Sequence, residues 1–323
     1  MILSKINYVI IMEDVNTMKI NNLCVAITFH YNPNRLKYLE QVTSHIDDLA
    51  NKVKLFIITN EHEENYLREI EKSTKAKNFQ IVTSGPLLHR YYLTWQHLKI
   101  FRTEYRNDLN ISHFMYLEDD IQIKQNNISY WLKAREDLRQ YGLIPSFLLY
   151  EVSKINKRSN SLSKPMIFRN IPKIKIGEFY WYLNMSQPYQ AMYLLDRELA
   201  KEHLFDNPLE KRETIWGVRE TAAAGLTFVN IPNGFSSRVA VGFDYNSFII
   251  DSNSLIHHLP NNYVNRPLTE YGKIKIQDLV LTNKNLFYFV TEIKIVLLRT
   301  IWKIRKTRVK YKYLIKNLMK QKI

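Results

Sequence analysis

Three consecutive carboxylates end a hydrophobic run in the middle of this chain. Residues 113–120 read His-Phe-Met-Tyr-Leu-Glu-Asp-Asp, and the apolar part of that run is typical of a β-strand. Like charges crowded at a strand end repel one another unless a cation lies beside them. A divalent metal ion with oxygen ligands would supply that cation. The alternative is a solvated acidic loop, but α/β proteins bind ligands where their strands end, so we expect a metal site.

The spacing of the three acids predicts different directions for their side chains. Alternate residues on an extended chain face the same side. We therefore expect Glu118 and Asp120 to point together toward a metal ion, while Asp119 turns elsewhere.

Two later segments carry residue types that suit the same kind of site. Residues 216–220 read Trp-Gly-Val-Arg-Glu, and the small residues of 222–225 follow them and allow a close approach of the backbone to a ligand. The alternative is an amphipathic helix with a surface glutamate. Further on, His257 and His258 are candidate metal ligands in the company of an acidic strand end, although paired histidines are more often structural or exposed.

The elements that must position these residues alternate in the first half of the chain. We expect strands at residues 23–29, 54–59, 79–83 and 111–117, and helices at 33–49, 63–73, 88–105 and 128–141. Such alternation predicts an α/β fold, with an open, mostly parallel sheet flanked by helices.

The pattern changes in the second half. We expect strands at residues 145–151, 189–195 and 226–231 and a short strand at 255–259. Helices are expected at 212–224 and from an N-cap at Asp196 to residue 203, and residues 153–175 are expected to form an inserted loop without periodicity.

Charge is distributed unevenly along the 323 residues. The formal net charge is +15, but the segment from residue 294 to the end holds eleven Lys or Arg and no acid. The 293 residues before it carry 35 basic and 31 acidic side chains, so this body is not expected to bind nucleic acid through charge alone. The lone Cys24 excludes an intramolecular disulfide and a cysteine-based zinc site.

The basic tail has the composition of a membrane-surface helix. Residues 287–298 are apolar with few interruptions, and residues 299–323 mix Lys and Arg with aromatic and aliphatic side chains. We expect residues 287–323 to lie on an anionic membrane surface; the alternative is a charged helix docked on the body. No stretch is long and apolar enough to cross a bilayer.

Taken in order, the three motifs resemble those of GT-A fold glycosyltransferases. The family's metal motif is Asp-x-Asp or a variant, and Asp120 matches its last acid. The family's Gly-x-Glu-Asp segment, often led by Trp, corresponds to residues 217–220, where Arg219 replaces the first acid and Glu220 replaces the aspartate. The family's late histidine matches His257 or His258, and the resemblance covers residues 23–263.

This resemblance implies a reaction and a set of roles. A nucleotide-diphosphate sugar, with UDP-sugars the expected donors, binds with Mn²⁺ or Mg²⁺ held by Asp120, Glu118 and a histidine. Glu220 takes the proton from the acceptor hydroxyl, which implies inversion at the anomeric carbon.

It also implies binding residues and a division of the chain. Residues 29–32 (Phe29, His30, Tyr31, Asn32), Asn60 and Asp119 are candidates to hold the donor, Arg90 and Arg219 to pair with its phosphates, and Tyr180, Trp181 and Tyr182 to stack on the acceptor. Loop or core packing is the alternative for the aromatic residues. The expected division is an N-terminal extension (1–22), a catalytic domain (23–275) with nucleotide-binding (23–142) and acceptor (143–275) parts, and a basic amphipathic helical tail (276–323).

The resemblance and the tail together suggest an enzyme on the cytoplasmic face of the membrane that acts on a lipid-linked glycan, as in the assembly of a bacterial surface polysaccharide. Two other functions stay open. A metal-dependent nuclease would use Asp120 and Lys124, although Gln122 stands where an acid is expected. A non-catalytic carbohydrate- or membrane-binding protein would keep the fold without turnover.

Overall fold

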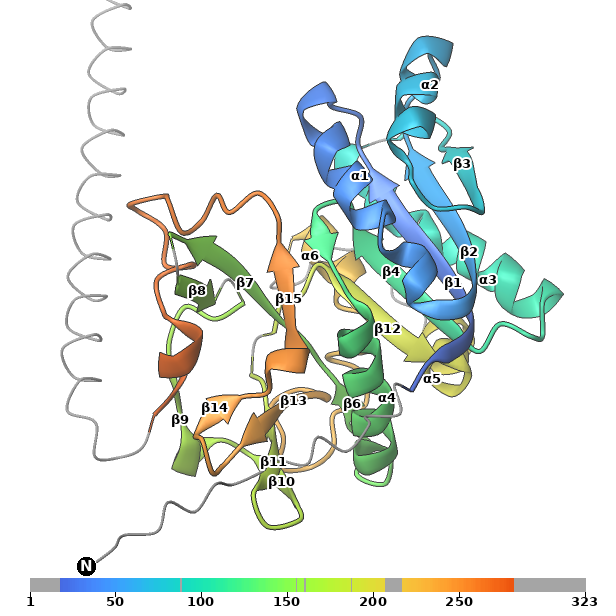
Figure 1. The fold of residues 1–323 in the computed structure, drawn as a ribbon. Coiled ribbons are helices and arrows are strands. Elements are labelled where there is room, and N and C mark those ends of the chain that lie inside the picture. The colour runs from blue at the N-terminus through green and yellow to red at the C-terminus, as the bar shows by residue number, and fades with distance from the viewer. Residues whose placement is uncertain are drawn as a thin grey trace, which may run out of the picture.

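The computed structural model describes residues 18–87, 89–154, 156–159, 161–186, 188–206 and 217–281. Within these ranges the chain forms an α/β structure of mixed sheets flanked by helices (Figure 1). The tail predicted at residues 287–323, residues 1–17 of the predicted extension, and Trp216 lie outside the described residues.

A five-stranded sheet occupies the first half of the fold, with the order β12-β4-β1-β2-β3. Four strands run parallel, namely β1 (Ile20–Phe29), β2 (Ala50–Thr59), β3 (Phe79–Thr83) and β4 (His113–Glu118). The fifth, β12 (Met192–Asp196), is antiparallel to β4. The continuous apolar runs of β1 and β4 suit strands that are buried on both faces. The mostly parallel sheet predicted for this half is therefore confirmed.

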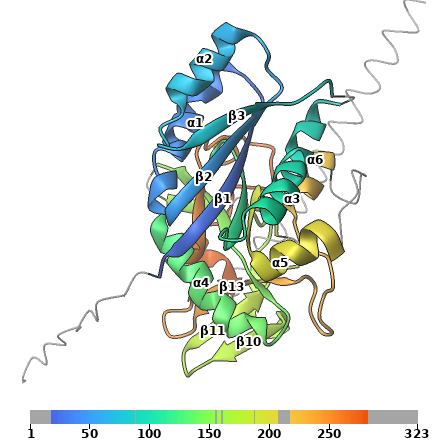
Figure 2. The same ribbon diagram turned by 90° about the vertical axis from the view of Figure 1, so that its right-hand side faces the viewer.

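Helices cover both faces of this sheet (Figure 2). One face carries α1 (Leu36–Thr43), α2 (Glu64–Ser73) and α4 (Gln125–Arg139), and the other carries α3 (His97–Asn107), α5 (Arg197–Lys201) and α6 (Val218–Ala223). The Asp196 side chain accepts a hydrogen bond of 2.8 Å from the backbone N–H of Leu199, so Asp196 is the N-cap that the sequence predicted for α5.

Two smaller sheets complete the fold. One has the order β10 (Lys173–Ile176), β11 (Tyr180–Asn184), β13 (Val239–Asp244) and β14 (Ile249–Ile250), and β6 (Ile144–Pro145) also pairs with β13. The other has the order β5 (Ile121–Gln122), β15 (Leu255–His258), β7 (Leu148–Ser153) and β8 (Asn156–Ser159). A single pair joins β9 (Met166–Ile167) to β16 (Val280–Leu281).

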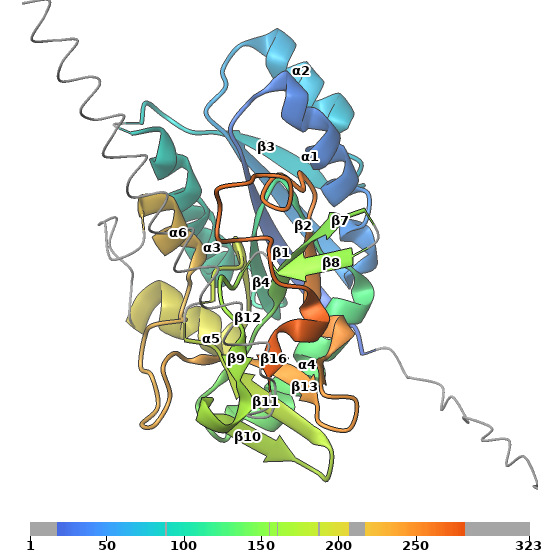
Figure 3. The same cartoon turned by 90° about the vertical axis from the view of Figure 1, so that its left-hand side faces the viewer.

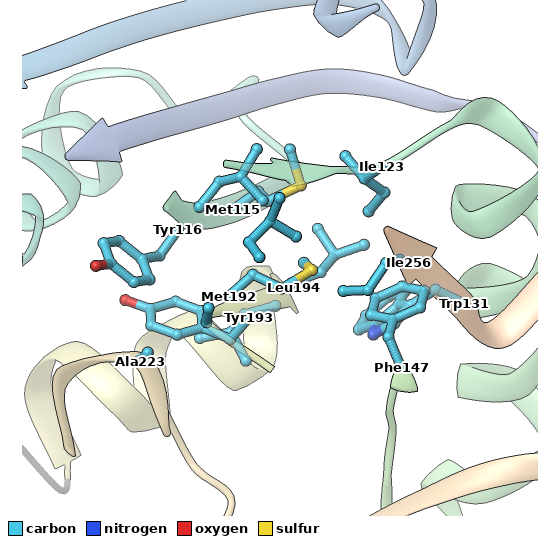
Figure 4. Close-up of a cluster of buried hydrophobic side chains, with 14 of the residues drawn as sticks. Met115, Tyr116, Ile123, Trp131, Phe147, Met192, Tyr193, Leu194, Ala223 and Ile256 are labelled. Carbon is cyan, nitrogen blue, oxygen red and sulfur yellow. The ribbon is translucent and has the colours of Figure 1, made fainter. Parts of the chain in front are cut away.

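A shared core joins the first sheet to these later elements (Figure 4). Met115 of β4 and Leu194 of β12 lie near Trp131 of α4, Phe147 and Ile256 of β15, and all five are buried. Burial of large apolar side chains is the dominant favourable term in folding, so this cluster fixes the later strands against the end of β4.

Several predicted elements differ from the structure. The predicted loop at 153–175 is wrong, because it contains β8, β9 and most of β10. These strands are too short to show a clear periodicity, and β9 pairs with β16, far away in the sequence. No strand forms at residues 226–231, which make turns, while β13 was not predicted. The predicted strand at 145–151 divides into β6 and β7.

Short helices interrupt or follow the longer elements. The first predicted helical region consists of the 3₁₀ turn Pro33–Arg35, α1 and the 3₁₀ turn Ile46–Asp48. In the predicted helix at 88–105, the 3₁₀ turn Arg90–Trp95 precedes α3. Further 3₁₀ turns lie at Phe168–Asn170, Ser252–Ser254 and Ile276–Asp278, and a π-helical turn at Glu202–Asp206 follows α5. In the described part of the chain, no helix combines the length and apolarity needed to cross a membrane.

Two buried histidines beside the first sheet predict a loss of stability in acid. Burial lowers the pKa of His97 to about 3 and that of His203 to about 4. The nearby positive charge of Arg102 lowers both pKa values further. The unfolded chain therefore binds more protons below the ordinary histidine pKa, and the free energy of unfolding falls as the pH drops from 6.5 toward 4.

His203 offers a direct test, because neither of its ring nitrogens has a hydrogen-bond partner among the described residues. We expect His203→Leu to reduce the stability lost between pH 7 and pH 5 by about 2 kcal/mol, measured by urea unfolding at each pH. The exposed His62→Leu is the matched control. Equal pH slopes in the two variants and the wild type would refute this assignment.

Candidate functional site

A cavity of about 620 Å³ lies at the carboxyl ends of the central parallel strands. Its walls include Thr28 at the end of β1, the acids that follow β4, Arg219 and Glu220 of α6, and His258 of β15. Thr28 and Glu118 are paired neighbours on β1 and β4, so the two strands end at the same edge. The cavity has the size of a small-molecule site.

Strand pairing brings the late histidine to the acidic strand end. β15 runs antiparallel to β5, with His258 opposite Ile121. As a result Nε2 of His258 lies 3.5 Å from Oδ2 of Asp120. The neighbouring His257 faces away from the cavity: its ring stacks on Tyr150 with 4.9 Å between ring centroids. Of the two predicted candidates, the structure places His258 at the site.

The three acids do not point as strand alternation predicted. β4 ends at Glu118, and Asp119 and Asp120 form a turn before β5, so the period of two no longer applies. Arg35 bonds both aspartates: Nε and Nη2 donate to Asp119 at 2.8 and 2.7 Å, and Nη2 donates to Asp120 at 2.8 Å. The prediction that Asp119 turns away from the other two acids is therefore wrong, because Glu118, Asp119 and Asp120 all line the cavity.

Glu118 has a separate set of partners. The Tyr189 hydroxyl donates a hydrogen bond of 2.8 Å to Glu118, and Nε of Arg219 lies 4.0 Å from the same carboxylate oxygen. Burial raises the pKa of Glu118 to about 7 despite Arg219. Burial and the charge of Asp120 likewise raise the pKa of Asp119 to about 6. Both carboxylates therefore lack full compensation.

Glu151 on β7 fixes His258 from behind. It is fully buried, and its carboxylate accepts hydrogen bonds from Nδ1 of His258 at 2.5 Å and from the backbone N–H groups of Tyr263 and Val264 at 2.8 Å each. Although burial opposes it, the bonds to Asp120 and Glu151 raise the pKa of His258 to about 9. Conversely, His258 and Arg35 outweigh burial and hold the pKa of Asp120 below its usual value.

Glu220 reaches the cavity from the first turn of α6. The indole N–H of Trp95 donates a 2.9 Å hydrogen bond to the Val218 carbonyl, which ties this helix to the turn before α3. A Cβ at Gly217 would lie 2.6 Å from the Glu220 carboxylate, so the absence of a side chain at Gly217 makes room for that carboxylate. Nη2 of Arg219 pairs with Glu220 at 3.1 Å.

A metal ion held by protein atoms alone does not fit this arrangement. Within the described ranges, no group of three or more His, Cys, Asp or Glu side chains is placed to bind one. Oδ1 of Asp120 is nevertheless buried and has no hydrogen-bond partner. Mg²⁺ and Mn²⁺ are often held by one or two carboxylates together with substrate phosphates, and Asp120 suits that mode.

The predicted donor-binding residues separate into two groups. His30, Tyr31, Asn32, Asp119 and Arg219 line the cavity. Tyr31 also donates a 2.6 Å hydrogen bond to Glu69 and packs on Tyr66 with 4.5 Å between ring centroids.

Other predicted residues are not placed at the cavity. Phe29 is a fully buried core residue, and Asn60 does not line the cavity. The Arg90 side chain lies outside what the structure describes. Lys124, required by the nuclease alternative, caps α4 and does not line the cavity.

The predicted acceptor platform of Tyr180, Trp181 and Tyr182 is part of β11, away from the cavity. Tyr180 donates a hydrogen bond to Asp251 at 2.5 Å and Tyr182 to Asp137 at 2.8 Å, while Trp181 packs on Phe168. None of the three lines the cavity, so the structure does not bring the predicted acceptor platform to this site.

Sequence reasoning missed Arg35, Glu151 and Tyr189. Each of them bonds to a residue far away in the sequence. Arg35 and Asp119 are 84 residues apart, and Glu151 and His258 are 107 residues apart. The sequence offered one signal: Glu151 lies next to the apolar residues of β7, and a buried acid needs a partner.

Comparison of the chain with models of known protein families and with curated proteins finds no match.

The buried position of Glu151 predicts a large effect of its neutralisation. Glu151→Gln removes the charge that compensates His258, and breaking a buried ion pair typically costs about 3–5 kcal/mol. We expect a loss of this size in the free energy of unfolding measured with urea at pH 7. Glu198→Gln, which disrupts the more exposed pair of Glu198 with Arg139, is the matched control and should cost about 1 kcal/mol or less. Equal losses in the two variants would contradict the role given to Glu151.

Proposed function

We propose that this protein is a metal-dependent glycosyltransferase with a GT-A fold, which moves a sugar from a nucleotide-diphosphate sugar to a glycan acceptor. The observation that carries the proposal is the convergence of three distant motifs, at Asp120, Glu220 and His258, on one cavity at the carboxyl edge of a mostly parallel sheet. Open α/β sheets bind nucleotides at this edge.

The charges around the cavity favour an anionic donor that arrives with a divalent cation. Five carboxylates (Glu118, Asp119, Asp120, Glu220 and the underlying Glu151) face two arginines (Arg35 and Arg219) and His258. Even with His258 protonated, the carboxylates exceed the cations by two, and this excess would repel a diphosphate. Asp120 would hold Mn²⁺ or Mg²⁺ together with the donor phosphates, and the metal would supply positive charge against the negative charge that develops on the diphosphate.

The protein's own side chains divide the remaining work. Arg219 reaches into the cavity and is placed to pair with the donor phosphates. Arg35 and His258 hold Asp120 in its ionised form. Glu220 accepts the proton of the acceptor hydroxyl as that hydroxyl attacks the anomeric carbon, which gives inversion. Tyr31 offers an aromatic face to the base of the donor, for which a UDP-sugar is the expected choice.

The acceptor and the location of the enzyme are inferred from the sequence. A lipid-linked glycan on the cytoplasmic face of the membrane suits the basic composition of residues 287–323.

A panel of UDP-, GDP-, CMP- and dTDP-sugars tests the reaction. We expect slow Mn²⁺-dependent hydrolysis of one donor, abolished by EDTA and reduced at least about hundredfold in Asp120→Asn, because transition-state charge loses its counter-charge. The exposed Glu64→Gln serves as the control and should keep the wild-type rate. Donor turnover that persists unchanged in Asp120→Asn would refute the proposal.

Gly217 tests the role of Glu220. Gly217→Ala should displace the Glu220 carboxylate and lower the rate of transfer by about tenfold or more, since small displacements of catalytic groups are costly. Binding of the donor with Mn²⁺, measured by calorimetry, should change little. Gly85→Ala, where an added Cβ meets no atom within 4 Å, is the matched control. A normal rate in Gly217→Ala would contradict the role given to Gly217 in positioning Glu220.

A further inference from the structure

Two segments of the body carry a clear net positive charge, although the body as a whole is nearly neutral. The segments 153–178 and 259–281 together carry ten Lys or Arg and three acids. The rest of the 293 residues before Lys294 therefore carries 25 basic and 28 acidic side chains. The body is therefore nearly neutral because the positive net charge of these two segments is offset by the negative net charge of its other residues. We call the described residues of these two segments the basic face.

The two segments form one continuous surface. The backbone N–H of Gly272 donates to the Ser159 carbonyl, and that of Ser159 donates to the Ile274 carbonyl, each at 2.8 Å. The Arg158 guanidinium donates to the Lys273 carbonyl at 2.5 Å. Figure 3 looks onto this side, where β8 lies near the orange segment and β9 lies beside β16, in which that segment ends.

Exposed apolar side chains stand among these basic residues. Leu268 is 53% exposed and Tyr271 is 40% exposed, and Lys157, Lys164, Arg169, Lys175 and Arg266 are exposed on the same two segments. Exposed aliphatic and aromatic groups within a basic surface are typical of contact with an anionic bilayer, where the apolar groups enter the interface and the cations meet lipid phosphates.

We propose that the basic face docks on an anionic membrane surface, as a contact separate from the C-terminal tail. Charge complementarity favours this occupant, and an exposed leucine gains nothing from a phosphodiester backbone but gains from burial at the lipid interface. The docking does not depend on the proposed transfer reaction.

The docked orientation has a consequence for the proposed function. A second cavity of about 540 Å³ is lined mainly by residues 161–172 of the basic face and shares Ser161 and Tyr271 with the first cavity. If the protein is a transferase, a membrane at this face brings a lipid-linked acceptor beside the cavity that holds Glu220.

Vesicle binding by the full chain tests the docking. The face variant replaces Lys157, Lys164, Arg169 and Lys175 with Gln. The control variant replaces Lys52, Lys72, Lys77 and Lys99, which are exposed on the first sheet and its helices, with Gln. The two variants have equal net charge and the same tail, so a difference between them isolates the basic face. Binding is measured by co-sedimentation with phosphatidylcholine vesicles, with and without phosphatidylglycerol.

We expect the face variant to bind the phosphatidylglycerol vesicles about tenfold or more weakly than wild type, and the control variant to lose less than about threefold. Leu268→Ser should also weaken binding several-fold. Equal losses in the two four-residue variants, or no loss in the face variant, would overturn the proposal. The proposal would also be overturned if the protein bound a DNA duplex more tightly than the vesicles, and if the face variant lost this DNA binding while Leu268→Ser kept it.

Hydrolysis of the donor in solution separates this inference from the proposed reaction. A face variant that loses vesicle binding supports the docking whether or not the protein turns over sugar nucleotides. Absence of turnover in every variant would count against the transferase alone.

Discussion

The structure around the cavity depends on the compensation of buried carboxylates. Charged groups leave water at a cost that only nearby opposite charges and hydrogen bonds offset. Here the cations come from separate parts of the chain: Arg35 follows β1, His258 lies on β15 and Arg219 on α6. Each pairing therefore fixes the position of one element relative to the end of β4. The same interactions that make the site possible also hold the two halves of the fold together.

The compensation is incomplete, and the remaining imbalance is informative. The pKa values of Glu118 and Asp119 lie near 7 and 6, well above the usual range for carboxyl groups, because burial and their neighbours favour the protonated form. A fully compensated structural network would keep them low, as Arg35 and His258 do for Asp120. Perturbed carboxyl groups inside a cavity are characteristic of functional sites, which is why a site that receives a further cation explains the arrangement better than a structural ion-pair network.

The sequence predicted the parts of the fold that local patterns determine. β3 matches its predicted bounds, and β1, β2 and β4 are buried strands whose apolar runs could be recognised directly. The strands within 153–175 could not be predicted, because β8 and β9 are too short to show a period, and β9 pairs with β16, far away in the sequence. The choice between His257 and His258 depends on the pairing of β15 with β5. The directions of the acids failed for a related reason: strand alternation stops where the chain turns, at Asp119. Arg35 had no local signal at all.

The charges of this protein act over two different ranges. Ionic screening confines a surface charge to about 8–10 Å in physiological salt, so the exposed cations of the basic face act on whatever approaches that surface. The buried acids of the cavity are screened far less, but they act only on what enters. The positive basic face attracts anionic ligands and surfaces, whereas the acids of the cavity repel anions that enter it. Retention there requires a cation that accompanies the ligand. If both proposals hold, this asymmetry separates recruitment, by the basic face, from selection, by Asp120 and its partners.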